Sequence, residues 1–152
     1  MTPGLKDQTE LRVVIAEDTV LLREGLRRVL TETGLAGAIQ ALVERSPVAT
    51  TVTAVPGGRY PAAIEATAYF VVSEALANVA KHARADSAQV MIRKFPGRLL
   101  VEVSDDGAGG ARSEGGSGLR GLADRVASVG GVLRVDSPPG GGTRLEADIP
   151  CP

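Results

Sequence analysis

The stretch LLVEVSDDGAGG, residues 99–110, decides the fold. Leu99, Val101 and Val103 alternate with residues of the opposite parity, which is the pattern of a strand buried on one face. The strand then runs into an acidic pair followed by glycines. Parity keeps Asp105 on the buried side and turns Asp106 away. Because a buried carboxylate needs hydrogen-bond donors, this loop is a candidate functional loop, although a tight Asp-Gly turn remains the alternative.

The surrounding segments predict the element order β-α-β-β-loop-α-β-β from residue 50 onward. Short apolar runs bounded by glycine and proline predict the strands, and apolar residues at helical spacing predict the helices. The expected strands are 50–55, 88–93, 99–104, 132–135 and 143–149, and the expected helices are 61–83 and 119–129. Helices at this spacing can cover only one face of a sheet, so we expect an α/β fold, a two-layer sandwich of a mixed sheet and helices.

The first of these helices carries polar residues beside its apolar stripe. Glu74 and Asn78 are i,i+4 neighbours, and Lys81 and His82 follow one turn later, roughly on the same face. An amide oxygen suits Mg²⁺, and an ammonium group can meet a phosphate. The stripe could therefore form a surface for metal and phosphate, but taken alone it fits an ordinary solvated helix face better.

Two further glycine segments flank the second helix. Gly116 and Gly118 open it, directly before Leu119, and backbone N–H groups at a helix N-terminus can bind phosphate. Residues 140–142 are three glycines that lead into the last strand, whose inward face begins at Thr143. Parity therefore puts the Thr143 hydroxyl on the core side, near the place where Asp105 leaves its strand.

These four signals, in this order, resemble the catalytic ATP-binding domain of two-component histidine kinases. That family lies in the gyrase–Hsp90–kinase–MutL ATPase superfamily, with its Bergerat-type fold. The sequence is most similar to the sensor kinases that pair with nitrate-response-type regulators. EALANVAKHA, residues 74–83, resembles the N box of that family, and residues 105–109 and 116–122 resemble its two glycine boxes. The resemblance runs from about residue 35 to the end of the chain.

The resemblance implies ATP and Mg²⁺ as ligands and gives each position a role. Asn78 would coordinate the magnesium ion, and Glu74 would be the polarising or basic residue. Asp105 would hydrogen-bond the adenine amine, directly and through water with Thr143. Gly107 and Gly109 would let the backbone approach the base, and Gly116 and Gly118 would act as hinges of a lid over the phosphates. The other implied nucleotide contacts are Lys81, His82 and Leu119.

The front of the chain follows a different pattern. LRVVIAEDTVLLREGL, residues 11–26, predicts a strand, an acidic turn and a helix that ends near Gly34, after a disordered lead-in over residues 1–10. This segment resembles the start of a response-regulator receiver domain, but the pattern stops before the strand that carries the phospho-accepting aspartate. We expect a fusion, natural or engineered, with a receiver-like remnant in residues 1–34 and the kinase-type domain in residues 35–152. Glu17 and Asp18 would then cap a helix rather than bind a metal.

The phosphoacceptor that the resemblance leads us to expect is missing. Family members are phosphorylated on a histidine of an upstream dimerisation helix, whereas the sole histidine of this sequence is His82, within the N box. The chain would therefore act as an ATP-binding catalytic module that phosphorylates only a histidine on a separate chain. The alternatives are a non-catalytic module that binds ATP or a partner, and a serine kinase of the anti-sigma type.

Composition limits the partners. The formal net charge is −1, which gives no electrostatic reason to expect nucleic acid. A lone cysteine, Cys151, excludes an internal disulfide, and no apolar run has the roughly 20 residues that span a bilayer. We expect a cytoplasmic protein whose partners are ATP and a histidine-containing dimerisation domain or a response regulator.

Overall fold

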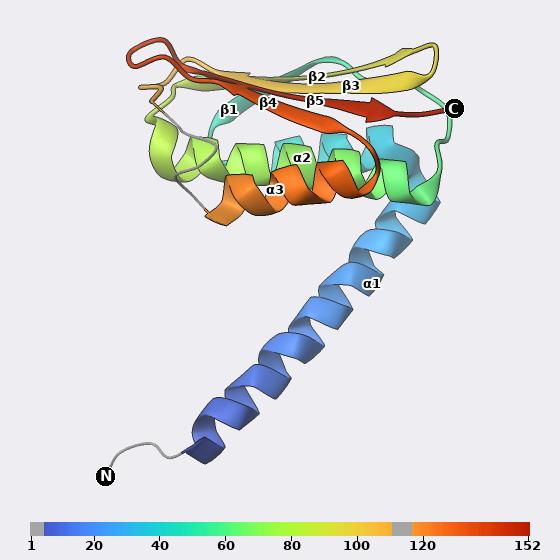
Figure 1. The fold of residues 1–152 in the computed structure, drawn as a ribbon, viewed down its shortest axis with the longest axis vertical. Helices are drawn as coiled ribbons and strands as arrows, with labels where there is room; N and C mark the ends of the chain where they lie inside the picture. The colour runs from blue at the N-terminus through green and yellow to red at the C-terminus, as the bar shows by residue number, and fades with distance from the viewer. Residues whose placement is uncertain (1–4, 111–116) are drawn as a thin grey trace.

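The computed structural model describes the backbone of residues 5–110 and 117–152, and the side chains of residues 24–82, 84–110 and 118–152. Figure 1 shows one sheet stacked on a layer of helices, with the first half of α1 projecting away from both layers. The elements in chain order are α1 (Leu5–Glu44), β1 (Ala49–Ala54), α2 (Ala62–Asn78), the π-helix η1 (Val79–Ala83), β2 (Ser87–Phe95), β3 (Arg98–Asp105), α3 (Ser117–Ser128), β4 (Val132–Asp136) and β5 (Thr143–Pro150).

The sheet is mixed and has the strand order β1-β2-β3-β5-β4. β1 pairs with β2 in parallel, which requires the crossover that α2 supplies, and all the other pairs are antiparallel. β3 is the central strand, between β2 and β5. Its last residue, Asp105, therefore has a neighbouring strand on both sides.

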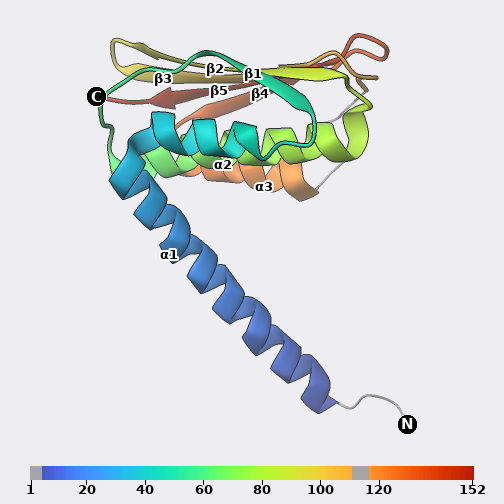
Figure 2. The same ribbon diagram turned by 180° about the vertical axis from the view of Figure 1, so that it is seen from behind.

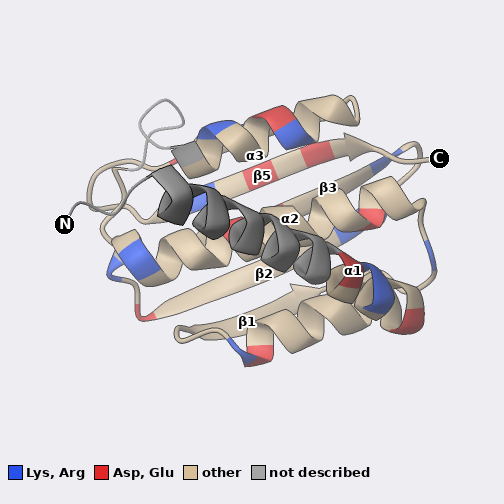
Figure 3. Ribbon diagram, turned by 90° about the horizontal axis from the view of Figure 1, so that it is seen from below, with Lys and Arg blue, Asp and Glu red and all other residues tan. Residues whose placement is uncertain are grey.

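The core lies between the sheet and the helices. The inward residues of β2, β3 and β5 are almost fully buried, as are the matching positions on α2. In Figure 3, seen from the helix side, α2 lies between α1 and α3 and carries little charge along its length. α2 thus contacts a helix on each flank and the strands β3 and β5, and its C-terminal end lies at one end of the sheet.

The structure confirms the expected two-layer sandwich and the order of its elements from residue 50. The predicted alternation also holds: Leu99, Val101 and Val103 are buried, as are Leu145 and Ala147 on β5. The outward residues of β5 form cross-strand ion pairs, such as Arg144 with Glu102 at 2.9 Å. β3 and β5 therefore present the faces that their period predicted.

The predicted strand over residues 11–16 is wrong. These residues lie inside α1, and residues 5–10, expected to be a disordered lead-in, also belong to that helix. Figure 2 shows this part of α1 standing clear of the sheet, whose edge on that side is β1. A lone strand has no neighbour to bond, whereas a helix satisfies its backbone groups internally, so the helix wins over the β-branched composition. Glu17 and Asp18 consequently lie within a helix and are not at its N-cap.

The helix that we expected near Gly34 runs on beyond that residue. α1 continues past Gly34, where the backbone leaves helical geometry with φ 71° and ψ −179°. After this kink Leu35, Ala38 and Ile39 are buried against the sandwich. Residues 35–44 are thus a packed part of the domain, while residues 5–33 form an arm that projects from it, with Leu30 buried near its base.

Candidate functional site

The predicted site residues of three elements meet at one end of the sandwich. Asp105, the last residue of β3, lies directly opposite Thr143, the first residue of β5, and on its other side opposite Ala88 of β2. The C-terminal end of α2 lies at the same end of the sheet (Figure 1). The sequence-based expectation that Thr143 lies near Asp105 is therefore confirmed by the strand register.

The two adjacent aspartates have different environments. Asp105 is half-buried, and its Oδ1 accepts a hydrogen bond from the Gly107 N–H at 2.8 Å. Asp106 is exposed, and both oxygens of its carboxylate accept hydrogen bonds from residues at the start of β2. Its Oδ1 accepts from the N–H groups of Asp86 and Ser87 at 2.9 and 3.0 Å, and its Oδ2 accepts from the Ser87 hydroxyl at 2.9 Å. These bonds, chiefly those from Ser87, lower the pKa of Asp106. Asp106 therefore has a structural role, and Asp105 keeps its Oδ2 without a hydrogen bond from the described residues.

Two glycine loops close around Asp105. The Gly110 N–H donates to the Ser137 carbonyl at 2.8 Å, and the Gly140 N–H donates to the Ala108 carbonyl at 2.6 Å. A side chain at Gly109 would strike the Pro138 carbonyl, and one at Gly142 would strike the Asp105 carbonyl; both glycines have positive φ. The loops thus approach each other through bare backbone next to Asp105, and we refer to these two glycine loops, residues 107–110 and 138–142, as the cradle.

Thr143 has a partner that the sequence analysis missed. Its Oγ1 lies 2.6 Å from the Oγ of Ser137, at the end of β4, and either hydroxyl can be the donor. Ser137 stands directly before a Pro-Pro-Gly run, where it reads as an ordinary turn residue, so only the strand register reveals the contact. The hydroxyl pair extends the polar rim of the cradle next to Asp105.

The polar residues of α2 lie at the same end, with one change from the expected geometry. Glu74 and Asn78 are half-buried at α-helical spacing. After Asn78 the helix widens into the π-helix η1, which ends at Arg84 in the left-handed region with φ 50°. Lys81 and His82 are exposed on this wider turn. Their angular positions therefore differ from those of a continuous α-helix, and the single stripe that we predicted ends at Asn78.

Helix α3 begins beside Glu74. A Cβ at Gly118 would strike Glu74 Oε1, so the carboxylate lies directly against the backbone of the first turn of α3. Leu119 is buried and contributes to the core. Gly116 lies outside the described residues. Of the second glycine box, Gly118 is therefore the position that the structure brings against the N box.

The described residues do not form a metal cage of their own. Within residues 5–110 and 117–152, no group of three or more His, Cys, Asp or Glu residues is arranged to hold a metal ion. Asn78 and Glu74 nevertheless offer uncharged and charged oxygen atoms at the α2 end. Mg²⁺ usually takes one or two protein oxygens and completes its shell with phosphates and water.

Arg59 and Glu65, at the opposite end of α2, escaped the sequence analysis. Glu65 has only 1% of its surface exposed, and its Oε1 accepts from Arg59 Nε at 3.1 Å. Only its spacing in the sequence could have predicted that Glu65 is buried. Residue 65 lies three residues before Ala68 and seven before Val72, which are apolar residues of the same helix.

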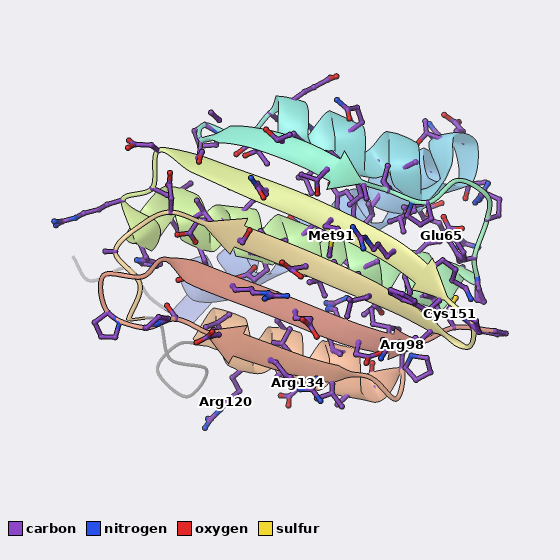
Figure 4. The ribbon with its side chains drawn as sticks, turned by 90° about the horizontal axis from the view of Figure 1, so that it is seen from above. Glu65, Met91, Arg98, Arg120, Arg134 and Cys151 are labelled. Carbon is purple, nitrogen blue, oxygen red and sulfur yellow. The ribbon has the colours of Figure 1, made fainter. Side chains whose placement is uncertain are left out.

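Figure 4 shows Glu65 at the same end of the sandwich as Cys151, which is buried. There burial raises the pKa of the Tyr60 hydroxyl, and Cys151 and Glu65 raise it further.

The family model described as histidine kinase-, DNA gyrase B-, and HSP90-like ATPase matches residues 63–152, which is more than half of the chain. The chain belongs to this family. Two of the similar curated proteins are histidine kinases by name. The chain is 34% identical over 97 residues to the signal transduction histidine-protein kinase/phosphatase DegS of Brevibacillus brevis, and 34% identical over 96 residues to the oxygen sensor histidine kinase NreB of Staphylococcus carnosus.

This histidine-kinase-type ATPase domain covers only part of those relatives. The alignments take in 62% and 60% of this chain but 25% and 28% of the two relatives. Among solved structures, the histidine kinase domain of the Erythrobacter litoralis EL346 blue-light activated histidine kinase matches with a TM-score of 0.63 and 28% identity, over 77% of this chain and 59% of that one. The Acinetobacter baumannii histidine kinase AdeS has the same fold at 10% identity, with a TM-score of 0.59 over 99% of this chain and 86% of that one.

Proposed function

We propose that this domain binds Mg-ATP in the cradle between its glycine loops and transfers the γ-phosphoryl group to a histidine on a separate chain. The observation that carries the proposal is the pairing of Asp105 with Thr143 across β3 and β5, beside loops that only glycine allows to approach. Asp105 Oδ1 is occupied by the Gly107 N–H. Its Oδ2 would accept a hydrogen bond from the exocyclic amine of adenine, and the Thr143 hydroxyl would hold a bridging water beside it.

The phosphates would extend from this cradle toward the ends of α2 and α3. Asn78 would supply one oxygen to Mg²⁺, and the ion would neutralise charge on the phosphate oxygens. Lys81 and His82, exposed on η1, would flank the phosphate tail. Gly116 and Gly118 would allow the segment before α3 to close over it, with Leu119 as the apolar contact at its root.

The transfer itself requires little from the protein besides position and a proton acceptor. A ring nitrogen of the incoming histidine attacks the γ-phosphorus in line, while the bond to the bridging oxygen of ADP breaks. Glu74 would polarise or take the proton from the other ring nitrogen. Its carboxylate lies against Gly118 at the first turn of α3. This is the end of the sandwich toward which the phosphates would extend.

The partners follow from this chemistry. The acceptor would be a histidine-containing dimerisation domain, and a response regulator would receive the phosphoryl group from it. We further propose that residues 1–34 derive from a receiver and that residues 35–152 derive from a kinase, with the front segment now helical. No helix in the described part of the chain is long and apolar enough to cross a membrane. We propose a cytoplasmic location.

A non-catalytic module that holds ATP or competes for a partner is the second candidate, because the sole histidine is His82. An experiment on phosphoryl transfer separates the two. The chain is incubated with labelled ATP and Mg²⁺, alone and with an isolated dimerisation domain from a related sensor kinase. We expect no acid-labile phosphate on the chain alone, because His82 lies on the helix that faces the phosphates, and label on the added domain.

Two outcomes would contradict the proposal. Phosphohistidine on the isolated chain, lost in His82→Gln while ATP binding is kept, would make His82 the acceptor. Tight ATP binding without label on any added domain, across several related sensor kinases, would instead favour the non-catalytic module.

A further inference from the structure

Three polar side chains form a row across one end of the sheet. Asp105 of β3 pairs with Thr143 of β5. On the other side of Thr143, the register that pairs Asp136 of β4 with Arg144 of β5 leads, one residue further, to Ser137. Directly opposed residues of antiparallel strands point to the same face of a sheet. Asp105, Thr143 and Ser137 therefore lie side by side, with Thr143 in the middle.

Ser137 also connects the two glycine loops of the cradle. Its carbonyl accepts a hydrogen bond from the Gly110 N–H at 2.8 Å. Its Oγ lies 2.6 Å from Thr143 Oγ1 and, at a longer 3.5 Å, donates to the Gly142 carbonyl. The bond to the backbone carbonyl fixes where Ser137 stands, so its hydroxyl reaches Thr143 from a defined place.

This contact restricts the hydroxyl of Thr143. A threonine carries a hydroxyl and a methyl group on the same carbon, and a change of rotamer moves one into the place of the other. The bond to Ser137 favours the rotamer that turns Oγ1 toward Ser137. Whichever hydroxyl donates, Thr143 Oγ1 still has a hydrogen or a lone pair with which to bind a water. Ser137 thus sets the position and the direction of that remaining bond.

We propose that Ser137 is a positioning residue of the nucleotide site, whose hydroxyl holds Thr143 Oγ1 where it binds the water beside the base. This inference rests on the proposed function, in which Asp105 accepts from the adenine amine and Thr143 holds a bridging water. The amine of adenine is flanked by two ring nitrogens, N1 and N7, and both are acceptors. The held water donates to the one beside it. Asp105 would therefore recognise the amine, and Ser137 would act through Thr143 on the recognition of a ring nitrogen.

The test compares three nucleotides by calorimetric titration of the whole chain. Mg-ATP is set beside its 1-deaza and 7-deaza analogues, in which a C–H group replaces one or the other ring nitrogen. Ser137→Ala should lower the affinity for ATP roughly three- to tenfold, and the loss should vanish with one of the two analogues. The variant keeps the carbonyl that accepts from Gly110, so the loops keep that bond. A merely structural role would weaken the binding of all three nucleotides equally.

Three further variants sharpen the outcome. Ser137→Thr keeps a hydroxyl and should restore the affinity of the parent. Ser87→Ala is the matched control, because the Ser87 hydroxyl lies at the same end of the sheet but donates to Asp106; it should bind like the parent. Thr143→Val removes the hydroxyl on which Ser137 acts. Adding Ser137→Ala to Thr143→Val should therefore cause no further loss of affinity.

Failure of this inference differs from failure of the proposed function. A parent that binds no Mg-ATP, or an Asp105→Asn variant that binds it as well as the parent, would overturn the adenine site itself. Weaker binding in Asp105→Asn together with unchanged binding in Ser137→Ala would overturn the role of Ser137 alone. An equal loss with ATP and both analogues, or a further loss in the double variant, would overturn that role as well.

Discussion

The two ends of the sandwich hold carboxylates in opposite ways. At the glycine-loop end, Asp105 is half-buried beside loops of bare backbone, and among the described residues its carboxylate accepts one hydrogen bond, from the Gly107 N–H. At the other end, Glu65 is fully buried and is anchored by Arg59 and the Tyr60 N–H. We propose that the first end admits a molecule, whereas the second end fixes the course of the chain. An open acceptor beside a cradle indicates a binding site, whereas a buried pair between elements indicates a joint.

The largest effect should come from filling the cradle. Gly142 has φ +74°, and a Cβ there would strike the Asp105 carbonyl, which cannot move without displacing β3. We expect Gly142→Ala to lower the free energy of unfolding by about 2–5 kcal/mol, from the left-handed backbone and from overpacking. Gly140→Ala is the matched control, because Gly140 has φ +78° and nothing within 4 Å of the added atom. It should cost about 1–2 kcal/mol. Equal losses in denaturant titrations would mean that the loops do not pack as closely as the structure shows.

The next effect concerns the metal. Asn78→Ala should bind ATP with an affinity that no longer rises when Mg²⁺ is added, because the proposed protein oxygen is gone. Its melting temperature should stay close to that of the parent, since Asn78 is only half-buried. Asn78→Asp keeps an oxygen at that position and should retain the response to Mg²⁺. Calorimetric titrations with and without Mg²⁺ decide the matter; full Mg²⁺ dependence in Asn78→Ala would make this residue part of an ordinary helix face.

A smaller effect distinguishes the two neighbouring aspartates by pH. The pKa of Asp106 is lowered from 3.8 by its bonds to Ser87 and Asp86. A depressed folded-state pKa means that the stabilisation is present above the unfolded value and is lost as the pH falls through the folded one. As the pH is lowered below about 4, the melting temperature of the parent should therefore fall more steeply than that of Asp106→Asn. Parallel curves for the two proteins would show that the carboxylate of Asp106 contributes no such linkage.

The sequence was sufficient to predict the sandwich and the proximity of Asp105 to Thr143. Strand parity placed Asp105 and Thr143 on one face, and the register then brought them opposite each other. That inference works because a period of two leaves no freedom once the core face is known. The order of elements from residue 50 followed from the same apolar periodicities, with glycine and proline marking the breaks.

Long-range contacts and local helix geometry were beyond that reasoning. The run LRVVIA, residues 11–16, has strand propensity, but the absence of a neighbouring strand in the fold makes it helical. The π-helix at residues 79–83 has no compositional mark, so the placement of Lys81 and His82 could not be foreseen. The contacts of Arg59 with Leu30 and Thr31 join residues nearly thirty positions apart, and sequence spacing carries no information about such pairs.

Binding of ATP to matched Asp105 and Asp106 variants tests the central claim most directly. Both substitutions, Asp105→Asn and Asp106→Asn, remove one carboxylate at adjacent positions. Calorimetric titration with Mg-ATP should show an affinity about tenfold or more lower for Asp105→Asn, because a lost hydrogen bond in a buried site costs about 1–3 kcal/mol. The Asp106 carboxylate accepts hydrogen bonds from residues at the start of β2, so Asp106→Asn should bind Mg-ATP with the affinity of the parent. Equal affinities for parent and Asp105→Asn, or a loss confined to Asp106→Asn, would contradict the assignment of this cradle as the adenine site.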